Sequence, residues 1–141
     1  MTIGAIPTGE QLLTIKNRIM TRKEKDYWEA SSRIVADFLR KLDIGVDLPF
    51  NMILRKELMD LQSGEMVPVT ITIYGKRHAE IECRDMVFGN EFIRIAATNR
   101  KCITNDIINS SVILATYLKA YGDDIERETK ERIEFLQSIL P

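Results

Sequence analysis

Residues 67–74 read VPVTITIY, and residues 78–84 read HAEIECR. In both stretches the apolar residues occupy every second position. A period of two places alternate side chains on opposite faces of a strand, with one face buried and the other in water. The alternation therefore predicts two adjacent strands with a shared buried face, formed by Val67, Val69, Ile71, Ile73, Ala79, Ile81 and Cys83.

The residues between these strands decide how the strands pair. A two-residue loop would place Ile73 opposite His78 and mix the two faces, whereas the three-residue loop 75–77 places Ile73 opposite Ala79. We therefore expect the three-residue loop. Further along, the pair 89–90 (Gly-Asn) suits a two-residue turn that leads into a third strand.

Helical patterns flank the predicted sheet on both sides. Before it, apolar residues spaced three or four apart from position 9 to 42 indicate either one helix or two helices with a break near Arg22. The stretch 50–62 fits either a helix or a short strand. After the sheet, Thr104 is suited to begin a helix, and Gly122 followed by Asp123 is suited to end it and begin another.

The order of these elements predicts the fold class. We expect one α+β domain over residues 1–141, with a three-stranded antiparallel meander at about 67–97. N-terminal helices and a C-terminal helical hairpin flank this meander.

Composition narrows the class of protein. The chain has 141 residues, of which 45% are hydrophobic and 29% charged, as in ordinary globular proteins. Its net charge of −1 argues against strong attraction to nucleic acid or to an anionic membrane. No apolar run is as long as a membrane span, which needs about 18 residues. The two cysteines and the absence of a secretory signal at the N-terminus predict a cytoplasmic protein.

Residues suited to catalysis are few. The single histidine, His78, lies near Glu80 and Glu82 on the water-facing side of its predicted strand, where an acid–base pair or metal site is conceivable. Zinc sites need three or four converging ligands, so a polar outer face is the simpler interpretation. No phosphate-binding loop or dinucleotide-binding motif occurs. We expect no catalytic residue, no metal and no cofactor.

Basic residues near the expected turns predict a ligand site instead. Two basic pairs, 76–77 and 100–101, could approach each other at one end of the sheet and bind a small phosphorylated ligand or a nucleotide. The predicted register also places Arg94 opposite Asp85, unless a bulge turns both charges to solvent. The expected ligand contacts are Lys76, Arg77, Phe88, Phe92, Arg94, Arg100 and Lys101, with the phenylalanines as a stacking surface.

An excess of apolar residues predicts self-association. In the expected register, the second hairpin places large side chains on the face that is otherwise assigned to water. Either helices of the same chain or a second copy must cover them. These residues are Met86, Phe88, Ile93 and Ile95.

Two functions follow from these observations. The first is a non-catalytic, self-associating regulatory or adaptor protein that forms a homo-oligomer and binds a protein partner. The alternative is a protein that binds small phosphorylated ligands. Nucleic acid is not an expected partner, because acidic residues interleave with the basic run at positions 16–25 and just after it.

The alternation makes a direct prediction about folding. Ile73→Asp places a charge on the buried face and should prevent folding, whereas Thr72→Asp on the opposite face should be tolerated. Circular dichroism of the two variants tests this, and equal helicity and melting behaviour would contradict the assigned faces.

Overall fold

The computed structural model describes residues 21–42, 49–60, 63–74 and 78–140. The fold is α+β, as the sequence predicts. In the described part of the chain, no helix combines the length and the apolar character that crossing a membrane requires. In chain order the elements are α2 (Arg22–Lys41), β1 (Met52–Met59), β2 (Met66–Tyr74), β3 (His78–Cys83), β4 (Met86–Gly89), α3 (Asn90–Thr98), the 3-10 helix η1 (Arg100–Cys102) and α4 (Asn105–Ile139).

The described strands form one antiparallel sheet in the order β1-β2-β3-β4. Ile73 lies opposite Ala79, and Ile71 lies opposite Ile81. This register is the one that a three-residue connection between β2 and β3 requires, so the predicted pairing is confirmed. Ile73 is buried and Thr72 is half-buried, which agrees with the predicted faces.

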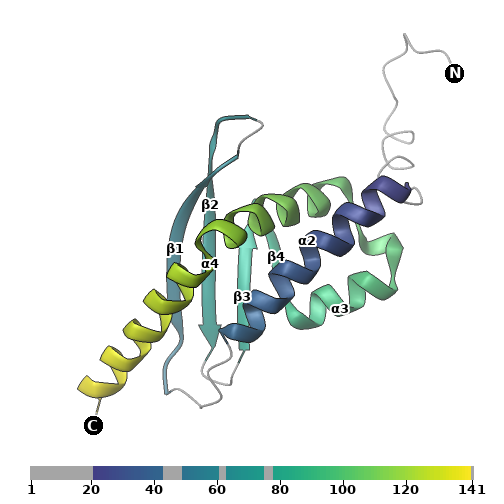
Figure 1. The fold of residues 1–141 in the computed structure, drawn as a ribbon. Helices are drawn as coiled ribbons and strands as arrows, with labels where there is room; N and C mark the ends of the chain where they lie inside the picture. Colours follow the sequence, from purple (N-terminus) through teal and green to yellow (C-terminus); the bar gives the residue numbers. More distant parts are fainter. Residues whose placement is uncertain (1–20, 43–48, 61–62, 75–77, 141) are drawn as a thin grey trace, which may run out of the picture.

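Helices α2 and α4 cover one face of the sheet, and α3 lies beside β4 (Figure 1). The alternate strand residues that face these helices are buried, and those on the opposite face are mostly exposed or half-buried. The core therefore lies between the sheet and the helices. Its largest fully buried side chains include Trp28, Leu39, Leu54, Ile71, Ile81, Phe88 and Leu114.

Helices α2 and α4 run side by side in the same direction. The hydroxyls of Ser31 and Ser111 form a buried hydrogen bond of 2.8 Å between them. Further along both helices, the ring of Phe38 lies close to Gly122. These contacts join residues that are far apart in sequence and hold the two helices against each other.

The predicted third strand is wrong. The chain turns at Arg84 and Asp85 rather than at residues 89–90, so Cys83 pairs with Met86. This two-residue turn places Met86 on the buried face with Cys83, whereas a strand continuing past Cys83 would place it on the other face. The strand β4 then ends at Gly89, and α3 begins at Asn90.

Asp85 and Arg94, which were predicted to face each other across two strands, lie in different elements. Asp85 is in the turn, with a φ of 64°, and Arg94 is on α3. Both residues are exposed. Arg94 forms an ion pair with Glu91, one turn away on the same helix, at 2.6 Å.

The sequence of residues 50–62 fits either a helix or a strand, and in the structure most of this stretch is strand β1. The apolar spacing from Leu54 to Leu58 fits a helix as well as a strand. Lys56 breaks the alternation because it faces the helices, where it forms an ion pair with Glu128 of α4. That tertiary contact accounts for a charged residue on the buried side of a strand.

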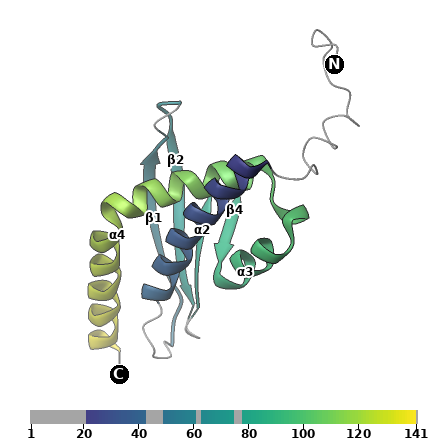
Figure 2. The same ribbon diagram turned by 45° about the vertical axis from the view of Figure 1, so that its right-hand side comes forward.

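The predicted C-terminal helical hairpin is also wrong, because α4 is one helix of 35 residues. Thr104 caps its start as predicted, accepting a hydrogen bond from the backbone nitrogen of Ile107. Instead of ending at Gly122, the helix continues and bends along its length (Figure 2). At the N-terminus, α2 begins at Arg22, as expected for a break there, and positions 1–20 lie outside the described residues.

Gly122 offers a test of the α2–α4 contact. A β-carbon there would lie 3.6 Å from the Phe38 ring, an ordinary van der Waals distance. We expect Gly122→Ala to stabilise the protein by about 0.5–1 kcal/mol, since alanine favours a helix interior over glycine. Thermal unfolding should show a melting temperature higher by a few degrees. Gly64→Ala serves as the control and should destabilise, because Gly64 has a φ of +73°.

Candidate functional site

A cleft lies between α2 and the segment formed by α3 and η1. Its volume is about 320 Å³, at the lower end of the range for small-molecule sites. Helix α2 supplies one wall, because residues three or four apart fall on the same helical face. The lining residues are Lys25, Trp28, Glu29, Ser32, Arg33, Ala36 and Arg40 from α2, Ile93 and Ala97 from α3, Arg100 from η1, and Ile103.

The floor of this cleft is mainly apolar. Trp28, Ala36, Ile93 and Ile103 line it and are buried. The indole nitrogen Nε1 of Trp28 is buried and has no hydrogen-bond acceptor within the part of the chain that the structure describes. A buried donor without an acceptor costs about 1–3 kcal/mol, so an unpaired indole beside a cleft is a feature that needs a reason.

The rim of the cleft is positively charged. Among the residues that the structure describes, it carries four basic side chains and one acidic side chain, Glu29. Lys25 lies 3.6 Å from Glu29, and Arg40 lies 2.6 Å from Asp37. Arg33 and Arg100 form no ion pair with any residue in the described ranges. Two guanidinium groups on opposite walls therefore remain available for an anion.

The structure separates the ligand contacts that the sequence predicted. Arg100 lines the cleft, and Lys101 is exposed beside it on η1. Arg94 is exposed on α3 and does not line the cleft. Phe88 is 1% exposed, with Phe92 packed edge-on against it at 6.0 Å between ring centres, so it offers no stacking surface. Lys76 and Arg77 lie outside the described residues.

The residues predicted for self-association are largely covered by the chain itself. Phe88 and Ile93 are buried, and Met86 is half-buried. Only Ile95 of this group is well exposed, at 45%. The β3–β4 turn explains the difference, because it directs Met86 and Phe88 toward the core, and α3 then turns Ile93 inward.

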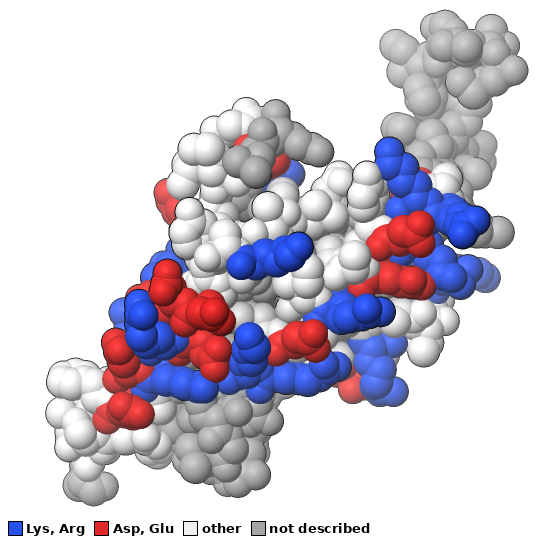
Figure 3. All heavy atoms as spheres, in the orientation of Figure 1, with Lys and Arg blue, Asp and Glu red and all other residues white. Residues whose placement is uncertain are grey.

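Sequence reasoning missed the cleft because its residues come from separate elements. On α2, Arg33 and Arg40 belong to a mixed-charge face that is typical of a solvated helix. Figure 3 shows such mixing, with acidic and basic side chains interleaved over α2 and over the C-terminal half of α4. Two lining residues had drawn attention in the sequence: Lys25, in the basic run at positions 16–25, and Arg100. The position of Arg100 beside α2 depends on α3 being a helix.

A second polar cluster lies on the outer face of the sheet. Glu80 accepts a hydrogen bond of 3.2 Å from the Tyr74 hydroxyl and lies 3.1 Å from His78 Nε2. The charge of Glu80 raises the pKa of Tyr74, with smaller contributions from burial and from this hydrogen bond. Glu82 lies on the same face. In the described part of the chain, no three histidine, cysteine or acidic side chains converge to hold a metal ion.

Comparison of the chain with protein-family models, curated proteins and solved structures finds no match.

The two cysteines differ in environment. Cys83 is buried in the core, and Cys102 is exposed on η1 near the cleft. Burial raises the pKa of the Cys83 thiol to about 11, and the positive charge of Arg84 opposes this only in part. Because the thiolate is the reactive form, Cys83 is a core residue rather than a nucleophile.

This difference predicts selective modification. At pH 8, a thiol with a pKa of about 11 is thiolate in about one molecule in a thousand. We expect one equivalent of a thiol-reactive dye to label the native protein, at Cys102, and a second to label Cys83 only after denaturation. Peptide mapping locates the label. Equal labelling rates at the two thiols in the native protein would show that Cys83 is accessible.

Proposed function

We propose that this protein is a non-catalytic binding protein that takes a small phosphorylated ligand in the cleft between α2 and α3. The proposal rests on two guanidinium groups, those of Arg33 and Arg100, which have no ion-pair partner among the described residues and lie above an apolar floor. Guanidinium groups bind phosphate through two parallel hydrogen bonds, which gives both charge and geometry. The apolar floor suits the organic part of such a ligand.

Binding rather than catalysis fits the side chains of the cleft. Histidine does not line it, and the one carboxylate among its described lining residues, Glu29, already has Lys25 as a partner. A general base needs a group that accepts a proton near neutral pH and reaches the substrate. The Trp28 side chain instead contributes apolar surface to the floor.

Self-association is a second proposed function, and a different surface favours it from the one that the sequence predicted. The last turns of α4 carry large apolar side chains in water: Phe135 and Ile139 are each 62% exposed, and Leu140 is 42% exposed. Exposed apolar residues grouped in this way are typical of protein–protein contacts. A regulatory or adaptor role would use such contacts. We infer a reducing, cytoplasmic setting from the two free thiols.

The ligand proposal predicts a specific pattern of losses. Isothermal titration with inorganic phosphate, pyrophosphate and nucleoside phosphates should detect binding of at least one of these anions. Arg33→Ala and Arg100→Ala should each weaken it by about ten- to a hundred-fold, because each removes a charged hydrogen bond worth roughly 1.5–3 kcal/mol.

Arg94→Ala is the matched control. Arg94 is an arginine of α3 that lies outside the cleft and pairs with Glu91. It should leave the affinity unchanged within about two-fold. The cleft is the wrong site if Arg94→Ala weakens binding as much as Arg33→Ala does, and the proposal fails if no anion binds the wild-type protein at millimolar concentration.

A further inference from the structure

Strand β1 lies at the edge of the described sheet, with β2 as its neighbour on one side. It has eight residues, which is long for an edge strand. An edge strand presents backbone N–H and C=O groups that can pair with a further strand. Natural edge strands are usually short or protected, so a long one in a folded protein needs a reason for its length.

The outer face of β1 carries an alternating set of residues: Ile53, Arg55, Glu57 and Met59. All four are exposed, with Ile53 at 50% and Met59 at 56%. Arg55 and Glu57 form no ion pair within the ranges that the structure describes. The edge therefore offers one positive charge, one negative charge and two flanking apolar side chains.

We propose that two copies of this chain pair antiparallel along β1, with Lys56 of each copy opposite its own counterpart at a two-fold axis. This inference rests on the self-association proposed above and gives it a geometry. In this register Arg55 lies opposite the partner's Glu57, Ile53 lies opposite the partner's Met59, and Leu54 lies opposite the partner's Leu58. Each pair occurs twice by symmetry, and an isologous interface of this kind is the commonest in homodimers.

Other registers are less favourable for simple reasons. A shift by one residue would place inward-facing residues opposite outward-facing ones. A symmetric register centred on Arg55 places two arginines opposite each other, and one centred on Glu57 does the same with two glutamates. Like charges directly opposite across strands are destabilising. Of these three centred registers, only the one on Lys56 matches opposite charges on the outer face.

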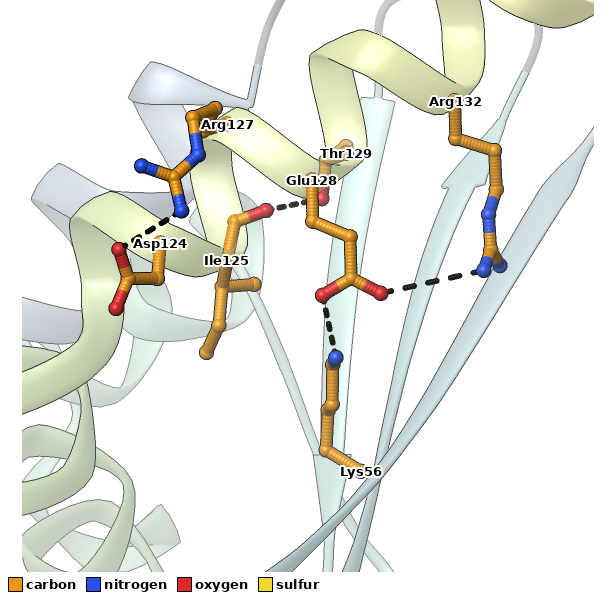
Figure 4. Close-up of polar contacts among 7 residues, drawn as sticks. All are labelled: Lys56, Asp124, Ile125, Arg127, Glu128, Thr129 and Arg132. Atoms are coloured by element: carbon orange, nitrogen blue, oxygen red, sulfur yellow. Dashed lines mark hydrogen bonds and ion pairs between the residues drawn. The ribbon is translucent and has the colours of Figure 1, made fainter.

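Lys56 opposes this pairing less than an unpaired lysine would. A lysine that points inward from an edge strand opposes the addition of another strand. Here Glu128 of α4 forms an ion pair with Lys56 (Figure 4). The same carboxylate lies 3.9 Å from Arg132, so it offsets the lysine charge in part. At the two-fold axis each lysine therefore brings its own carboxylate partner.

Helix α4 supports the same partner. Its C-terminal end projects past the β1 edge in both ribbon views (Figures 1 and 2). That end carries the exposed side chains of Phe135 and Ile139. A second copy joined at β1 would extend the sheet beneath this overhang, so one partner would cover both the strand edge and the apolar end of the helix.

Charge exchange tests the register. Sedimentation equilibrium of the full-length wild-type protein should show a monomer–dimer equilibrium. Arg55→Glu or Glu57→Arg alone should raise the dimer dissociation constant by about ten-fold or more, because like charges then face each other twice. The double variant carrying both changes should return to within about three-fold of wild type. An equimolar mixture of the two single variants should also form a heterodimer.

Glu82→Arg is the control, since it makes the same charge change on the outer face of the central strand β3. It should leave the dimer intact. A wild-type protein that stays monomeric at several hundred micromolar would overturn self-association as a whole. If the wild-type protein forms a dimer but the double variant does not recover the wild-type affinity, the β1 register is wrong and self-association still stands. Phosphate binding in the cleft, measured on the same samples, is independent of both results.

Discussion

The ion pair between Arg84 and Asp60 holds the turn on which much of the molecule depends. Arg84 and Asp85 have φ values of 52° and 64°, a left-handed conformation that residues other than glycine seldom adopt in succession. The buried carboxylate of Asp60, just after β1, binds the Arg84 guanidinium and so ties this turn to the far side of the sheet. Because the turn is made there, β4 directs Phe88 into the core and ends at Gly89. Helix α3 then starts at Asn90 and brings Arg100 to the cleft wall opposite Arg33.

The sequence predicted the parts of the fold that rest on local alternation. Strands β2 and β3, their register and the capping of α4 by Thr104 follow from patterns within a few residues. The failures share another cause, because each depends on a contact with a distant element. In the β3–β4 turn, Arg84 pairs with Asp60, and the inward-facing Lys56 pairs with Glu128. Helix α4 continues through Gly122, where the Phe38 ring of α2 packs against it. The cleft was missed for the same reason, since its two walls are joined only in the folded chain.

The cleft and the β1 edge lie on different elements but share a rigid connection. Helix α2 forms one wall of the cleft, and α4 compensates the charge of Lys56 on β1. Between the two helices, the hydroxyls of Ser31 and Ser111 are buried and bonded to each other. Sliding α2 along α4 would break that bond and move the Phe38 ring away from Gly122. Interiors packed in this way resist gradual deformation, so the two helices should move as one body.

The parallel course of α2 and α4 has a consequence for how the chain folds. Ser31 and Ser111 are 80 residues apart, and the whole sheet lies between them in sequence. Contacts of such separation close large loops, and chains dominated by them fold more slowly than chains with local contacts. The two helices can gain their stabilising contact only once the intervening strands have brought them together. On the ribosome, α2 therefore lacks its α4 partner until the last helix has emerged, although the sheet and α3 can cover other parts of its buried face before then.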